Sequence, residues 1–155
     1  MSVEIKIYSR LQIIKETTFH DDNLNQYPND YFICVNATGG LHAWPRFKKE
    51  HNTVLNINFD DTDVDKEKWL GPIKYFARAC TETQAKEIVN FIDKIPNGAT
   101  VHVYCTRGQS RSPAIGQFIQ EYKNKKAPVE LNEDMNFYLY KLLHTVSNTN
   151  NTESF

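Results

Sequence analysis

Apolar runs in the first part of the chain predict three strands. Residues 3–7 alternate apolar and charged side chains, a pattern typical of an edge strand. Residues 31–35 form a continuous apolar run, and residues 54–59 carry apolar side chains on one face and asparagines on the other. The polar stretch 16–30 contains Asn, Asp and Pro, which favour loops. The first part of the chain therefore combines strands with irregular segments.

Apolar residues at helical spacing predict two long helices later in the chain. Thr81-Glu82-Thr83-Gln84 is a capping box, and the apolar spacing after it continues to Ile95, before Pro96-Asn97-Gly98 ends the helix. The last helix is predicted to begin at Asn132-Glu133-Asp134. We expect it to bury six apolar or aromatic residues: Met135, Tyr138, Leu139, Leu142, Leu143 and Val146. Residues 62–80 predict an added loop and a short helix.

Length and composition are those of one ordinary domain. The chain has 155 residues, of which 40% are hydrophobic and 12% aromatic, enough for a single sizeable core. We expect one folded domain over residues 1–146 and a disordered polar tail over 147–155. No apolar run approaches the roughly 20 residues of a membrane span, and the N-terminus lacks the apolar core of a signal peptide. The expected location is the cytoplasm.

The stretch 101–113 carries the strongest chemical signal. Val101-His102-Val103-Tyr104 predicts a strand, Cys105 follows it, and Ser112-Pro113 opens a helical pattern with Ser112 as the expected N-cap. A tight loop between a strand and a helix N-terminus is a ready anion site. Its N–H groups would stabilise a Cys105 thiolate, and Arg111 could bind two phosphate oxygens at once. This arrangement predicts attack by Cys105 on a phosphate ester.

The pattern C-x-x-G-x-x-R-S-P over Cys105–Pro113 resembles the cysteine-dependent protein tyrosine phosphatases, and most closely their small dual-specificity branch. The resemblance implies that Cys105 is the nucleophile, that Arg111 holds the phosphate, and that Ser112 stabilises the thiolate when it departs. It also implies a phosphate-binding loop made by Thr106, Arg107, Gly108, Gln109, Ser110 and Arg111. The family usually has His before the Cys, whereas this chain has Tyr104.

This family implies an α/β fold with a central, mostly parallel sheet of four or five strands flanked by helices, as in dual-specificity phosphatases. In such folds the strand 54–59 and the strand before Cys105 open their loops at the same sheet edge. The family uses an Asp in that loop to protonate the leaving oxygen, and Asp61 resembles it. Asp60 is an alternative, and the acidic run 60–65 is also compatible with a solvated turn.

Other motifs are assigned to structural roles. In Ala43-Trp44-Pro45-Arg46, Arg46 stands where larger tyrosine phosphatases carry their acid, so we interpret Trp44 as a packing residue or a wall near the pocket. Cys34 is expected to be a buried apolar side chain rather than a disulfide partner of Cys105. The widely spaced cysteines favour reduced thiols, and the five His residues form no ligand cluster, so no metal and no cofactor are expected.

The predicted activity is hydrolysis of phosphotyrosine, and of phosphoserine or phosphothreonine, in proteins or peptides. A net charge of −1 argues against nucleic acid as a general partner, and no membrane partner is expected. Two alternatives stay open. One is an RNA 5′-phosphatase of the same fold, which would favour basic residues around the pocket. The other is a catalytically weak phosphate-binding module. The pattern does not indicate an oligomeric state.

Overall fold

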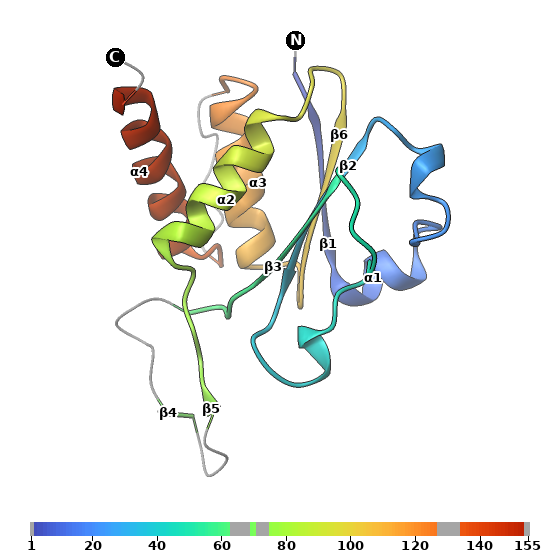
Figure 1. Cartoon of the computed structure of the whole chain (residues 1–155). Helices are drawn as coiled ribbons and strands as arrows, with labels where there is room; N and C mark the ends of the chain where they lie inside the picture. The colour runs from blue at the N-terminus through green and yellow to red at the C-terminus, as the bar shows by residue number, and fades with distance from the viewer. Residues whose placement is uncertain (1, 63–68, 71–74, 127–133, 154–155) are drawn as a thin grey trace.

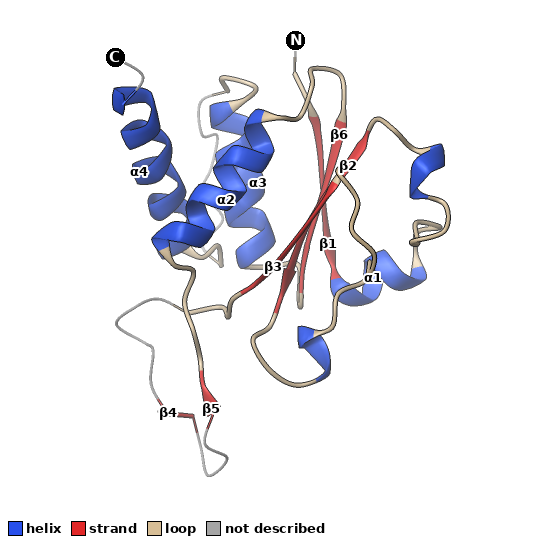
Figure 2. Cartoon of the chain, in the orientation of Figure 1, coloured by secondary structure: helices blue, strands red, loops and turns tan. Residues whose placement is uncertain are grey.

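A four-stranded, all-parallel sheet forms the centre of the molecule, an α/β fold flanked by helices (Figures 1 and 2). The computed structural model describes residues 2–62, 69–70, 75–126 and 134–153. Across the sheet the strands are β1 (Glu4–Ser9), β6 (Thr100–Cys105), β2 (Asp30–Asn36) and β3 (Val54–Asn58). The three early apolar runs and the run before Cys105 are all strands, and the first is an edge strand, as predicted.

Three helices cover one face of the sheet (Figure 1). They are α2 (Glu82–Asp93), α3 (Arg111–Tyr122) and α4 (Phe137–Glu153), with α4 packed on both others. Thr81 and Gln84 form the predicted capping box at the start of α2. Apolar residues of these helices and of the sheet make the main core, which includes the sulfur-bearing residues Cys80, Cys105 and Met135.

A second, smaller core lies on the opposite face. There α1 (Arg10–Lys15), η1 (Leu24–Gln26) and the segment after β2, which contains η2 (Leu41–Ala43), lie beside the sheet (Figure 1). Its buried residues are Ile13, Leu24, Phe32, Cys34, Phe47 and Tyr104. Because side chains alternate along a strand, Tyr104 belongs to this core and Cys105 to the main core.

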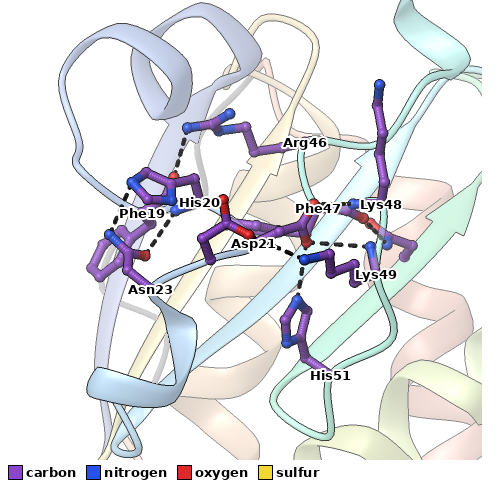
Figure 3. Close-up of polar contacts among 11 residues, drawn as sticks. Phe19, His20, Asp21, Asn23, Arg46, Phe47, Lys48, Lys49 and His51 are labelled. Atoms are coloured by element: carbon purple, nitrogen blue, oxygen red, sulfur yellow. Dashed lines mark hydrogen bonds and ion pairs between the residues drawn. The ribbon is translucent and has the colours of Figure 1, made fainter.

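Asp21 holds Lys48, Lys49 and His51, in the segment after η2, through hydrogen bonds (Figure 3). Its carboxylate accepts hydrogen bonds from the backbone N–H groups of Lys48 (3.0 Å) and Lys49 (3.2 Å) and contacts His51 Nε2 at 3.0 Å. Burial alone would raise the pKa of Asp21, but the hydrogen bond with His51 and the two backbone donors lower it. Arg46 joins the same assembly by donating from Nη2 to the carbonyl oxygen of Phe19 at 2.6 Å.

The structure differs from the sequence prediction at several points outside the cysteine loop. The helix α4 begins at Phe137 rather than at 132–134. Residues 132–133 lie outside the described residues. Tyr138 and Leu142, which we expected to be buried, are only half-buried. The helix continues through Glu153, and Ser147 is buried, so helical structure extends beyond the expected domain end at Val146. The short helix expected near the end of 62–80 is absent from the part described there. Trp69–Leu70 (β4) and Tyr75–Phe76 (β5) instead pair as antiparallel strands.

None of the helices that the structure describes combines the length and the apolar composition needed to cross a membrane.

Candidate active site

Cys105 ends β6 and lies at the base of the loop that leads into α3. Its side chain is buried, and its Sγ is within hydrogen-bond distance of Ser112 Oγ at 3.1 Å. Two backbone N–H groups also donate to Sγ: that of Gly108 at 3.2 Å and that of Ser112 at 3.4 Å. The loop is therefore folded around the sulfur, and its donors can bind negative charge there.

This environment favours the thiolate of Cys105. Burial by itself would raise the pKa of the thiol. The side-chain and backbone hydrogen bonds from Ser112, the positive charge of Arg111 and the N–H of Gly108 outweigh burial and lower the pKa below its ordinary value. Burial instead raises the pKa of the two other cysteines, Cys34 and Cys80. Of the three cysteines, Cys105 is therefore the one whose surroundings favour the thiolate.

Gly108 is required by the path of the loop. Its φ of +70° lies in the left-handed region, which glycine adopts without strain. A Cβ atom there would lie 2.7 Å from the backbone N of Ser9 and 2.8 Å from the carbonyl carbon of Tyr8. Because it has no side chain, Gly108 can lie close to the backbone at the end of β1. Its N–H also donates to Cys105 Sγ.

The start of α3 differs from the sequence prediction. The N-cap is Ser110, whose side chain makes no capping hydrogen bond, and the helix begins at Arg111. Ser112 is therefore the second residue of the helix rather than its N-cap. Its hydroxyl contacts the Cys105 sulfur instead. At this position both the hydroxyl and the backbone N–H of Ser112 reach the Cys105 sulfur.

Arg111 is almost fully buried, with 6% of its surface exposed. Its Nη1 donates to the carbonyl oxygen of Phe59 at 2.7 Å. Its Nε is buried and has no hydrogen-bond partner among the described residues. An unpartnered donor on a buried cation is costly, and the guanidinium adjoins a pocket. A bound oxyanion would satisfy this donor and balance the charge.

Asp60 and Asp61 have different surroundings although they are adjacent. Asp60 is buried, and its carboxylate accepts from the backbone N–H groups of Thr38 (3.1 Å) and Arg78 (2.8 Å) and from the Thr38 hydroxyl. Asp61 is exposed, and its Oδ1 accepts from Ser110 Oγ at 2.6 Å. Asp61 is therefore the carboxylate that lies beside the cysteine loop, whereas Asp60 connects the backbone of neighbouring segments.

A pocket of about 530 Å³ opens over this loop. It is lined by Asp61, Cys105, Thr106, Arg107, Gln109, Ser110, Arg111 and Asp134. Of the residues expected from sequence, only Gly108 and Ser112 are not among the lining residues, and both instead contact the Cys105 sulfur from the protein side. The structure thus brings the predicted residues together around one space.

Two residues near this pocket were missed by sequence reasoning. Asp134 lines it, and the Nδ2 of Asn136 donates to Asp61 Oδ1 at 3.0 Å. Asn136 precedes Phe137 at the start of α4, and its Oδ1 accepts from the N–H of Leu139 at 3.0 Å. Asn is a favoured N-cap residue, so the sequence held a signal for its capping role but none for its contact with Asp61.

Tyr104, the residue before Cys105, makes its hydrogen bonds on the other face of the sheet. Its hydroxyl donates to Asn36 Oδ1 at 2.7 Å and accepts from the N–H of Arg46 at 3.2 Å. Burial raises its pKa, and the phenol is neutral. Arg10 connects this network to the loop, since its Nη1 reaches Asn36 Oδ1 at 3.4 Å and its backbone N–H donates to Thr106 O at 3.3 Å.

Two further sequence interpretations concern residues outside the pocket. Cys34 is fully buried in the second core, on the face of the sheet opposite to Cys105, and both are free thiols. Trp44 is 61% exposed, does not line the pocket described above, and has Lys48 Nζ at 5.6 Å from its ring centroid. Trp44 is therefore not the buried packing residue or pocket wall that we expected.

Within the described ranges, no three His, Cys, Asp or Glu side chains gather as a set of metal ligands. No protein-family model, curated protein or solved structure matches the chain.

Proposed function

We propose that this protein is a phosphomonoesterase that works through a phosphocysteine intermediate, with the fold and mechanism of the dual-specificity phosphatases that the stretch Cys105–Pro113 resembles. One observation carries the proposal: a cysteine with a lowered pKa shares a pocket with a buried arginine whose Nε has no hydrogen-bond partner in the described part of the chain. A nucleophilic thiolate beside an unfilled oxyanion donor is suited to a phosphate ester.

In the first step the Cys105 thiolate attacks phosphorus. The S–P bond forms as the ester P–O bond breaks, and a proton from the Asp61 carboxyl goes to the leaving oxygen. Arg111 supplies charge and directed N–H donors to the oxygens of the phosphoryl group, which carry negative charge in the transition state. The pairing of Arg111 Nη1 with the Phe59 carbonyl helps to keep the guanidinium in place.

In the second step water attacks the phosphocysteine. Asp61, now a carboxylate, accepts the proton from water as the new P–O bond forms and the S–P bond breaks. The departing sulfur regains the hydrogen bonds from Ser112 and Gly108 that stabilise the thiolate. Because Cys105 must be a reduced thiol for each cycle, we propose the cytoplasm as the working compartment.

The proposed substrates are proteins or peptides that carry phosphotyrosine, phosphoserine or phosphothreonine. The pocket contains the cations Arg107 and Arg111 and the carboxylates Asp61 and Asp134. A pocket lining with equal numbers of basic and acidic side chains suits a single phosphate group on a peptide better than a polyphosphate. The pocket lining therefore does not favour the RNA 5′-phosphatase alternative, which calls for a more basic rim.

Steady-state hydrolysis of an aryl phosphate by the purified chain tests the proposal, with phosphate release as the readout. Cys105→Ser should abolish turnover and retain binding of inorganic phosphate, because Arg111 and the loop N–H groups remain. Arg111→Lys should lower kcat/KM severely, since an ammonium lacks the planar pair of donors. Phosphate binding without turnover by the wild-type protein would support a binding module instead. Turnover by Cys105→Ser would remove Cys105 from the nucleophile role.

A further inference from the structure

Asn136 connects three segments that meet at the pocket. Its Nδ2 donates to Asp61 Oδ1 at 3.0 Å and to the carbonyl oxygen of Thr62 at 3.3 Å. Its backbone N–H donates to the carbonyl oxygen of Ser110 at 3.1 Å. The loop after β3, the cysteine loop and the start of α4 are therefore joined through one residue.

The orientation of the Asn136 amide is fixed by the helix that it caps. Its Oδ1 accepts from the N–H of Leu139, a bond that only an oxygen can accept. The NH₂ group must then be the end that contacts Asp61. The N-cap of α4 thus places an amide donor against the carboxylate that we assign as the general acid.

Both donors to the Asp61 carboxyl reach the same oxygen. Ser110 Oγ at 2.6 Å and Asn136 Nδ2 at 3.0 Å donate to Oδ1, and within the described residues no donor reaches Oδ2. An oxygen that accepts two hydrogen bonds is a poor site for the acidic proton. The proton for the leaving group then resides on Oδ2.

We propose that Asn136 is a positioning residue for Asp61: its amide holds Oδ1, orients the carboxyl group and leaves Oδ2 to carry the catalytic proton. This inference rests on the proposed function. It assigns to the α4 N-cap a role in the reaction that differs from capping. Capping and positioning of Asp61 predict different reaction rates for variants at position 136 that keep the helix cap.

Asn136→Ser and Asn136→Asp separate the two roles, because Ser and Asp are both good N-cap residues. Asn136→Ser should lose the amide donor but keep the cap. We expect kcat on phenyl phosphate, a poor leaving group, to fall about 10- to 100-fold, the usual effect of a misplaced catalytic group. On 2,4-dinitrophenyl phosphate, whose leaving group departs without a proton, the loss should be much smaller.

Asn136→Asp places a second carboxylate against Asp61. Two adjacent carboxylates do not both ionise readily, so the pair holds a proton to higher pH. The alkaline limb of the kcat profile should therefore move to higher pH.

Asn124→Ser is the matched control. Asn124 also joins distant segments, since its side chain bonds both to the N–H and to the carbonyl oxygen of Val3, at 2.8 and 3.0 Å, but it does not line the pocket. We expect this variant to alter thermal stability without changing the ratio of rates on the two esters. The inference is overturned if Asn136→Ser lowers both rates equally, or if Asn136→Asp leaves the pH profile unmoved. A wild-type protein that hydrolyses neither ester overturns the proposed function as well.

Discussion

The carboxylates of Asp60 and Asp61 bond to different parts of the molecule although the two residues are adjacent in the chain. Asp60 is bound by the backbone of Thr38 and Arg78, and Asp61 by the hydroxyl of Ser110 in the cysteine loop. Both carboxylate oxygens of Asp60 accept hydrogen bonds, whereas Oδ2 of Asp61 receives none from the described residues and is able to carry a proton. The contacts therefore favour Asp61 as the acid and give Asp60 a structural role.

Asp61→Asn should lower kcat on phenyl phosphate by about 10² to 10⁴, the usual contribution of a positioned general acid. The loss should shrink for 2,4-dinitrophenyl phosphate, because that leaving group needs no proton. Initial rates on both esters across a pH range measure this effect. The alkaline limb of the profile should also flatten in the variant.

Asp60→Asn is the control for this assignment. It removes charge from a buried carboxylate that accepts two backbone N–H groups, and loss of such a bond costs about 1–3 kcal/mol. We expect a lower free energy of unfolding in urea and similar rate losses on both esters. If Asp60→Asn shows the leaving-group dependence and Asp61→Asn does not, the two roles are reversed.

The four strands of the main sheet and the capping box were predictable because they depend on local patterns. The apolar run 31–35 is almost entirely buried, the alternation in 54–58 matches a buried Ile57 between two exposed asparagines, and Thr81 with Gln84 completes a cap within one turn. The start of α3 was not predictable in this way. Ser110 and Ser112 are both N-cap types, and the choice depends on how the loop closes around the Cys105 sulfur.

The partners of the acid could not be predicted either. The sequence identified an acidic run after β3, but the contacts that distinguish Asp60 from Asp61 come from Thr38, Arg78 and Ser110, which are distant in the chain. Asn136 lies 75 positions from Asp61. Long-range side-chain contacts of this kind carry no periodic signal.

Ser112→Ala should raise the pKa of Cys105, because the Ser112 hydroxyl helps to lower it against the effect of burial. Attack requires the thiolate, so the acidic limb of kcat/KM should move to higher pH. The pH dependence of alkylation by iodoacetamide measures the same titration without turnover. Ser112→Thr, which retains a hydroxyl, should stay close to the wild type.

Ser147→Ala is the matched control for this change. Ser147 is also a buried helical serine, and its hydroxyl donates to the carbonyl oxygen of His144 at 2.9 Å. It should leave the alkylation midpoint unchanged. An identical midpoint in Ser112→Ala and the wild type would show that the hydroxyl does not stabilise the thiolate.

Gly108→Ala should destabilise the fold more than Gly98→Ala. Both glycines have positive φ, +70° and +88°, and an alanine in the left-handed region costs roughly 1–2 kcal/mol. At Gly98 a Cβ would meet no atom within 4 Å, whereas at Gly108 it would lie 2.7 Å from the backbone N of Ser9. Urea unfolding compares the two variants, and equal losses would contradict the close approach.

The composition of the pocket leads to a prediction about substrates. Its lining has two arginines, two acidic residues and the neutral side chains of Thr106 and Gln109. A multiply phosphorylated head group or a 5′-triphosphate carries several negative charges and would be repelled by Asp134. One phosphate on a peptide carries a charge of about −1.5 to −2 at pH 7, which Arg107 and Arg111 together can balance.

We therefore expect hydrolysis of phosphotyrosine peptides together with measurable hydrolysis of phosphoserine or phosphothreonine peptides, and little activity on phosphoinositides. Values of kcat/KM for these substrates and for a 5′-triphosphorylated RNA, measured at one ionic strength, decide among the alternatives. Asp134→Asn should raise the relative rate on multiply charged substrates, because it removes one carboxylate from the rim. A strong preference of the wild-type protein for the RNA would favour the RNA 5′-phosphatase. Strict selectivity for phosphotyrosine would indicate a pocket deep enough to exclude the shorter phosphoserine and phosphothreonine side chains.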